Sequence, residues 1–90
     1  MQKEAAKILI VEDEPAMAFI LKKLITDMGY SVCASVVSGE ESIIEAEKHM
    51  PDLVLMDINL EGEMDGIEAA EIILTKFGIP VIYATADGEE

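Results

Sequence analysis

Four short, largely apolar segments alternate with longer segments of helical periodicity along the chain. Residues 7–11, 53–56 and 81–84 lack the polar alternation of a half-exposed strand, which predicts strands buried on both faces. Residues 32–37 are more mixed in polarity and are predicted to form an edge strand.

The segments between these strands show the spacing of amphipathic helices, in which apolar residues recur every three or four positions. Gly29 and Gly78 follow two of these segments as stop signals. Ser38-Gly-Glu-Glu41 has the form of a capping box and opens the middle helix, and Pro51 lies just beyond that helix. The predicted apolar faces are Met17, Ile20, Leu21, Leu24, Ile25 and Met28 in the first helix, Ile43, Ile44 and Met50 in the second, and Ile67, Ala70, Leu74 and Phe77 in the third.

The predicted elements follow the order β-α-β-α-β-α-β. This order calls for a parallel sheet with helices on its faces, so we predict an α/β fold with a three-layer, doubly wound sheet. Residues 1–90 form a single domain in this interpretation. Residues 87–90 have the form of a helix start, so we expect the domain to be C-terminally incomplete, with the strand at 81–84 left as an apolar edge.

The chain is strongly acidic, and this property narrows the classes of partner. It carries 19 acidic residues against six lysines, no arginine, and a formal net charge of -13, which disfavours nucleic acids and anionic membranes as partners. The apolar runs are too short to span a bilayer, and the N-terminus lacks the apolar core of a signal peptide. Cys33 is the single cysteine, so an internal disulfide is excluded, and we expect a cytoplasmic protein.

Acidic side chains follow the first and third predicted strands. Glu12 and Asp13 end the first strand, Asp57 ends the third, and Thr85 follows the fourth. In a parallel sheet the carboxyl ends of neighbouring strands meet at one edge, so these three carboxylates are predicted to converge. Close carboxylates raise one another's pKa unless a divalent cation replaces the protons, and Mg²⁺, or Mn²⁺ in its place, suits oxygen ligands. An aspartate beside such a cation can attack phosphorus, which makes Asp57 a candidate phosphoryl acceptor and Thr85 a candidate ligand of a phosphoryl oxygen.

Three spaced motifs resemble the receiver domain of two-component response regulators. They are Ile8-Leu-Ile-Val-Glu-Asp-Glu14, then Leu53-Val-Leu-Met-Asp-Ile-Asn-Leu60 with Met64-Asp-Gly-Ile-Glu68, and finally Pro80-Val-Ile-Tyr-Ala-Thr-Ala86. The resemblance runs from about Lys7 to the last residue. It implies a flavodoxin-like fold with strand order 2-1-3-4-5, of which this chain would supply 2-1-3-4, without the fifth strand and the last helices.

The resemblance also implies roles for individual residues. Glu12 and Asp13 would hold Mg²⁺ together with Asp57 and the backbone carbonyl of Asn59. Thr85 would be the switch hydroxyl, Ala86 would leave the phosphoryl group accessible, and Asn59 and Asp87 would tune its lifetime. The expected donor is a phosphohistidine on a sensor histidine kinase or a phosphotransfer domain, and the output protein or domain is open, as is homodimer formation. Such a domain is not an enzyme beyond self-phosphorylation from small phosphodonors and slow autodephosphorylation.

The chain departs from the family pattern in two places. The loop at residues 60–66 lacks a frequent proline and is one residue longer than the commonest form. The lysine that the family carries on its fifth strand has no counterpart, and Lys76 is a poor substitute by position.

Two other functions compete with a phosphorylated signalling domain. A phosphohydrolase of the haloacid-dehalogenase type also uses an aspartate after an apolar strand, but it requires a second acid two residues later, where this chain has Asn59. A receiver-like binding module that never accepts phosphate is the other alternative. The missing lysine favours such a module, whereas the retained acids and Thr85 oppose it.

Overall fold

The computed structural model describes residues 5–60 and 62–84 of the chain. In this part the elements are β1 (Lys7–Val11), α1 (Pro15–Asp27), β2 (Ser31–Val36), α2 (Gly39–His49), β3 (Leu53–Met56), α3 (Gly66–Phe77) and β4 (Val81–Tyr83). The helices of this part are too short or too polar to cross a membrane.

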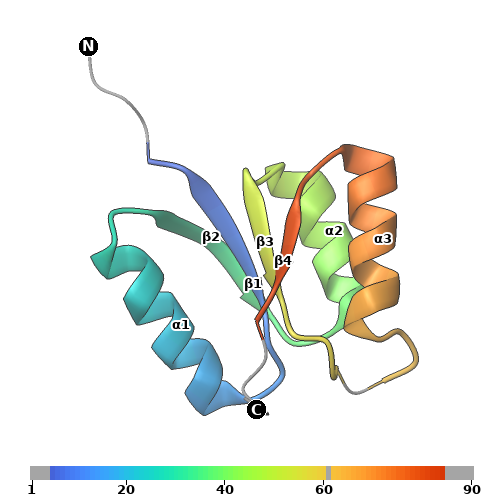
Figure 1. The fold of residues 1–90 in the computed structure, drawn as a ribbon, viewed down its shortest axis with the longest axis horizontal. Coiled ribbons are helices and arrows are strands. Elements are labelled where there is room, and N and C mark those ends of the chain that lie inside the picture. The colour runs from blue at the N-terminus through green and yellow to red at the C-terminus, as the bar shows by residue number, and fades with distance from the viewer. Residues whose placement is uncertain (1–4, 61, 85–90) are drawn as a thin grey trace.

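The four strands form one parallel sheet in the order β2-β1-β3-β4. This order confirms the predicted doubly wound sheet and places β2 at an edge, as its mixed composition indicated. Helix α1 lies on one face of the sheet, and α2 and α3 lie together on the other (Figure 1). The three layers are therefore α1, the sheet, and the α2–α3 pair.

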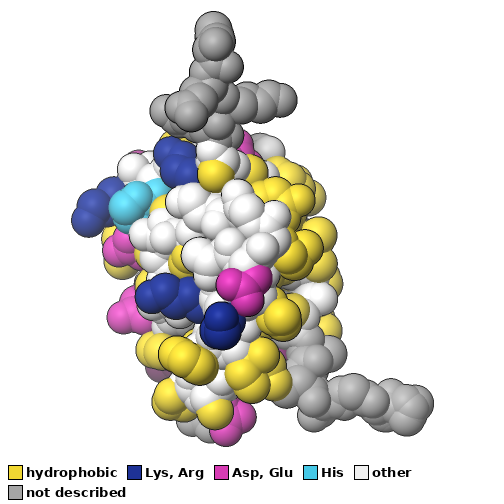
Figure 2. Space-filling view, turned by 90° about the vertical axis from the view of Figure 1, so that its left-hand side faces the viewer, with side chains coloured by type: hydrophobic (Ala, Val, Ile, Leu, Met, Phe, Trp, Pro, Cys, Tyr) yellow, Lys and Arg dark blue, Asp and Glu magenta, His cyan; other side chains and the backbone are white. Residues whose placement is uncertain are grey.

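The larger apolar core lies between the sheet and the α2–α3 pair. Its buried members are Leu9, Val11, Ala46, Val54, Met56, Leu60, Ala69, Ile73 and Ile79. On the opposite face, a smaller cluster of Ile8, Ile10 and Ile25 packs beneath α1. Hydrophobic side chains remain at the surface on the side of the molecule that carries α1, beside lysines (Figure 2).

The helix ends follow the local signals of the sequence. The Ser38 hydroxyl accepts a hydrogen bond from the Glu41 N–H at 3.1 Å, which confirms Ser38 as the N-cap. The Glu41 carboxylate accepts a hydrogen bond at 3.2 Å from the Val37 N–H, one residue before the N–H that a capping box uses. Gly78 ends α3 in the left-handed conformation with φ of 71°. Met50 ends α2 in the same conformation with φ of 45°, which is unusual for a residue with a side chain.

The predicted apolar helix faces are wrong at several positions. Ile20, Leu24, Met28, Ile44, Met50, Ile67 and Leu74 are all exposed. In α3 the buried side is formed by Ala69, Ala70 and Ile73, so the true face is turned by about one residue from the predicted one. The reason is that α3 carries two adjacent apolar rows, and periodicity alone does not tell which row the sheet covers.

Strand boundaries differ from the prediction by single residues. The second strand is Ser31–Val36 rather than 32–37, and the fourth ends at Tyr83 rather than at residue 84. The helix start predicted at residues 87–90 lies outside the described residues.

Candidate functional site

The acidic residues of β1 and β3 lie on the α1 side of the sheet. Side chains alternate between the two faces of a strand, and Ile10 and Leu55 point toward α1. Glu12 lies two positions after Ile10, and Asp57 lies two positions after Leu55. Each acid therefore continues the row of side chains that faces α1. The alternation of the strands thus directs both carboxylates to one face.

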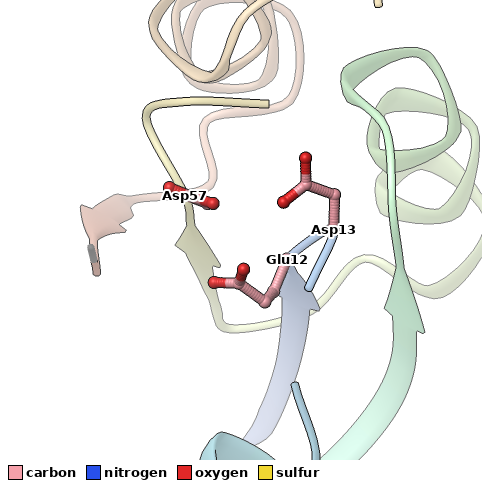
Figure 3. A group of neighbouring side chains, drawn as sticks. All are labelled: Glu12, Asp13 and Asp57. Carbon is pink, nitrogen blue, oxygen red and sulfur yellow. The ribbon is translucent and has the colours of Figure 1, made fainter. Parts of the chain in front are cut away.

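The register of the two strands makes these acids neighbours. Val11 of β1 pairs with Met56 of β3, and the Asp57 N–H donates to the Val11 carbonyl oxygen at 2.9 Å. Asp13 follows Glu12 directly, and Figure 3 shows the three side chains turned toward one another at the ends of the two strands. One carboxylate oxygen from each of Glu12, Asp13 and Asp57 lies within 4.8 Å of the others. The predicted convergence of the three acids is confirmed.

Glu12 is buried in an unfavourable environment for a charge. Its residue exposure is 3%, and its Oε2 accepts a hydrogen bond from the Glu14 N–H at 3.1 Å. Its Oε1 is buried without a hydrogen-bond partner. Burial raises the pKa of Glu12, and the hydrogen bond from the Glu14 N–H lowers it. The negative charges of Asp57 and Asp13, and the hydrogen bond that a protonated Glu12 can donate to Asp57, raise the pKa further.

Asp57 is held by the turn that follows β3. It is 8% exposed, and its Oδ1 accepts a hydrogen bond from the Asn59 N–H at 3.1 Å. Asp13 and Asn59 line an open depression beside the start of α1, together with Glu14 and Pro15. The cluster is therefore buried at Glu12 and Asp57 and open to small molecules on the side of Asp13.

These residues fit a hard divalent cation. Carboxylate oxygens are the ligands that Mg²⁺ prefers, and the unpartnered Glu12 Oε1 is a buried acceptor that a cation would satisfy. Among the described residues, neither Glu12 nor Asp57 forms an ion pair with a lysine or histidine. Buried charges in proteins are normally paired or coordinate metals, so this donor set could hold a cation.

The remaining site predictions have different outcomes. Asn59 contacts Asp57 through its N–H, and the role of its carbonyl oxygen as a metal ligand stays a prediction. Thr85, Ala86 and Asp87 lie outside the described residues. The sequence reasoning missed the contribution of the Glu14 backbone to Glu12, because a backbone N–H leaves no signal in the identity of its residue.

A family model for the response regulator receiver domain matches residues 8–90 of the chain. The transcriptional regulatory protein PdtaR of Mycobacterium tuberculosis is 36% identical over 80 residues, which cover 89% of this chain and 38% of PdtaR. The phyllosphere-induced regulator PhyR of Methylorubrum extorquens is 37% identical over 83 residues, which cover 91% of this chain and 31% of PhyR. The chain thus spans well under half the length of both relatives.

A solved structure agrees with these sequence relatives. The signal receiver domain of a modulated diguanylate cyclase from Desulfovibrio desulfuricans G20 superposes with a TM-score of 0.87 at 33% identity, covering 93% of this chain and 67% of that one. The fold, the strand order and the sequence of this chain thus all match those of receiver domains. Receiver domains are signalling domains rather than enzymes. The chain belongs to the response regulator receiver domain family.

Proposed function

We propose that this receiver domain accepts a phosphoryl group on Asp57 with the help of Mg²⁺. The observation that carries the proposal is the buried convergence of Glu12, Asp13 and Asp57, in which one oxygen of Glu12 has no partner. Glu12, Asp13, Asp57 and the carbonyl oxygen of Asn59 would hold the cation. Mg²⁺, when bound, would neutralise negative charge on the incoming phosphoryl oxygens.

The chemical step uses the carboxylate of Asp57 as the nucleophile. One of its oxygens forms a bond to phosphorus while the bond from phosphorus to the donor's histidine nitrogen breaks, and the electron pair of that bond returns to the imidazole. The hydrogen bond from Asn59 to Oδ1 fixes the orientation of the carboxylate before the attack. The open depression beside Asp13 gives the donor a path to the site.

The consequence of phosphorylation would be a change in a surface that a partner recognises. A new phosphoryl group biases a pre-existing equilibrium between two conformations by its differential contacts with them. Thr85 would bind a phosphoryl oxygen, and Ala86 and Asp87 would set the access to the acyl phosphate and its lifetime. This domain would act in the cytoplasm, where the donor would be a sensor histidine kinase or a phosphotransfer domain, and the output would belong to another domain or protein.

The test is an intact-mass measurement after incubation with a small acyl phosphate and Mg²⁺. We expect one phosphoryl adduct on the wild-type chain, and no adduct on Asp57→Asn or after removal of the metal. Asp27→Asn is a matched control, because Asp27 lies on the exposed surface of α1 in an ion pair with Lys23.

Three results would contradict parts of the proposal. An adduct that persists in Asp57→Asn would show that another residue is the acceptor. An adduct that forms without a divalent cation would remove the proposed role of the acidic cluster. Absence of any adduct while Mg²⁺ still binds would favour the receiver-like binding module.

A further inference from the structure

Gly66, the first residue of α3, lies in direct contact with the backbone of Asp57. A Cβ atom built on Gly66 would overlap the Asp57 carbonyl oxygen. It would also stand 2.9 Å from the Asp57 carbonyl carbon and 2.9 Å from the Ile58 Cα. These atoms belong to the main chain and cannot rotate away, so a side chain at position 66 forces the start of α3 and the backbone at residues 57 and 58 apart.

The requirement for glycine here is steric and does not come from backbone conformation. The described glycines with positive φ are Gly29, Gly62 and Gly78, and Gly66 is not among them. Residues with a side chain therefore accept the dihedral angles of Gly66, and only the closeness of Asp57 excludes them.

Hydrogen bonds connect the start of α3 to the turn that follows Asp57. The Gly66 N–H donates to the Ile58 carbonyl oxygen at 3.1 Å, and the Asn59 N–H donates to Asp57 Oδ1 at 3.1 Å. The Asp57 N–H itself donates to the Val11 carbonyl oxygen of β1 at 2.9 Å. The start of α3 thus packs on the short turn that sets the direction of the Asp57 carboxylate and of the Asn59 carbonyl.

We propose that Gly66 is a positioning residue for the phosphoacceptor centre. Its missing side chain lets α3 press against the Asp57 carbonyl and fixes the turn at residues 57–59 in the geometry that the cation needs. This inference rests on the proposed function of Asp57 and the acidic cluster. It adds that the start of α3, which supplies no ligand of its own, sets the affinity of the site.

Gly78 provides a matched control at the opposite end of the same helix. A Cβ atom built there meets no atom within 4 Å, and the cost of a side chain comes only from its φ of 71°. Gly78→Ala therefore weakens the end of α3 without touching the turn after β3. Comparing Gly66→Ala with Gly78→Ala separates positioning of the site from general loss of helix stability.

The first arm of the experiment uses metal-free protein and amide chemical shifts from NMR. We expect Gly66→Ala to move the amide signals of Asp57, Ile58 and Asn59, and Gly78→Ala to leave these signals in place. Unchanged signals for these residues in Gly66→Ala would overturn the inference. Because this arm contains no metal, it stays decisive even if the wild-type chain proves to have no affinity for Mg²⁺, a result that would refute only the proposed function.

The second arm measures Mg²⁺ affinity by calorimetric titration of the same proteins. We expect Gly66→Ala to bind Mg²⁺ more weakly by on the order of tenfold or more, the usual effect of disturbing a group that orients a metal ligand. Gly78→Ala should keep the wild-type affinity. An affinity of Gly66→Ala within about twofold of wild type would overturn the inference. If Gly66→Ala does not fold, both arms are run in a Met50→Gly background, which stabilises the far end of α2 away from the site.

Discussion

Strands β1 and β3 present two rows of side chains that differ at their ends. Toward α2 and α3, the rows stay apolar through Val11 and Met56, which are 1% and 0% exposed. Toward α1, the rows of Ile10 and Leu55 end in Glu12 and Asp57, which are almost as deeply buried. The side chains at the ends of the two rows are therefore similarly buried, but those facing α2 and α3 are apolar and those facing α1 are acidic.

The difference separates what stabilises the fold from what serves the proposed function. Burial of apolar side chains against α2 and α3 is favourable at every position, in proportion to the area removed from water. Burial of Glu12 is unfavourable, because one of its oxygens has no partner and other acids lie beside it. We infer that apolar packing on the α2–α3 side stabilises the fold. This stabilisation offsets the unfavourable burial of the acids on the α1 side.

The largest expected loss of stability comes from a substitution that creates a cavity in the core between the sheet and the α2–α3 pair. Ile73 is 0% exposed, and Ile73→Ala should lower the free energy of unfolding by about 3 kcal/mol. The neighbouring Leu74 is 53% exposed, and Leu74→Ala should cost about 1 kcal/mol or less. Urea titrations of the two variants measure the difference. Equal losses would contradict the assignment of the core to this side of α3.

The next effect is stabilisation by the cation at the acidic ends of the rows. At a free Mg²⁺ concentration about a hundred times the dissociation constant, the free energy of unfolding of the wild type should rise by about 2.7 kcal/mol. Asp57→Asn should lose this gain, and Asp27→Asn, on the exposed face of α1, should keep it. Thermal melts with and without Mg²⁺ provide the measurement. A gain of equal size in Asp57→Asn would place the cation elsewhere.

A smaller effect is expected when the charge of Glu12 is removed. Because its pKa is raised in the fold, the folded chain holds a proton that the unfolded chain has lost, so metal-free stability falls as pH rises above about 4.3, the ordinary pKa of glutamate, and through the raised value. Glu12→Gln lacks this titration. It should be more stable than the wild type at neutral pH, and the difference should close as the pH falls toward about 4.3. A gap that does not change with pH would show that burial of the charge has no such cost.

The smallest effect concerns a site outside both rows. Met50 is exposed and adopts the left-handed conformation at the end of α2, so Met50→Gly should raise the free energy of unfolding by about 0.5 to 1 kcal/mol. Mg²⁺ affinity should not change, since α2 packs on the opposite face from the acids. A destabilised Met50→Gly variant in urea titration would show that the Met50 side chain contributes more than its conformation costs.

The sequence predicts the sheet and the acidic cluster well, because both depend on local signals. Apolar runs mark the strands, the β-α order sets their parallel arrangement, and the strand ends place Glu12 and Asp57 at one edge. The helix N-cap at Ser38 is also a local signal, and the structure confirms it.

The features that the sequence does not predict depend on contacts between distant segments. The buried face of α3 contains Ala69 and Ile73 rather than Ile67 and Leu74, because the sheet covers only one of two apolar rows. The contact between Gly66 and the Asp57 backbone depends on how tightly α3 packs on the turn after β3. Periodicity carries no information on either choice.

The most direct test of Asp57 as the phosphoryl acceptor is to locate the phosphoryl group within the chain. Borohydride reduces an aspartyl phosphate to homoserine, which marks the acceptor permanently for sequencing of peptides by mass spectrometry. After incubation with a small acyl phosphate and Mg²⁺, we expect homoserine at position 57 and at no other aspartate. Homoserine at Asp13 or at a surface aspartate such as Asp27, with Asp57 unchanged, would contradict this assignment.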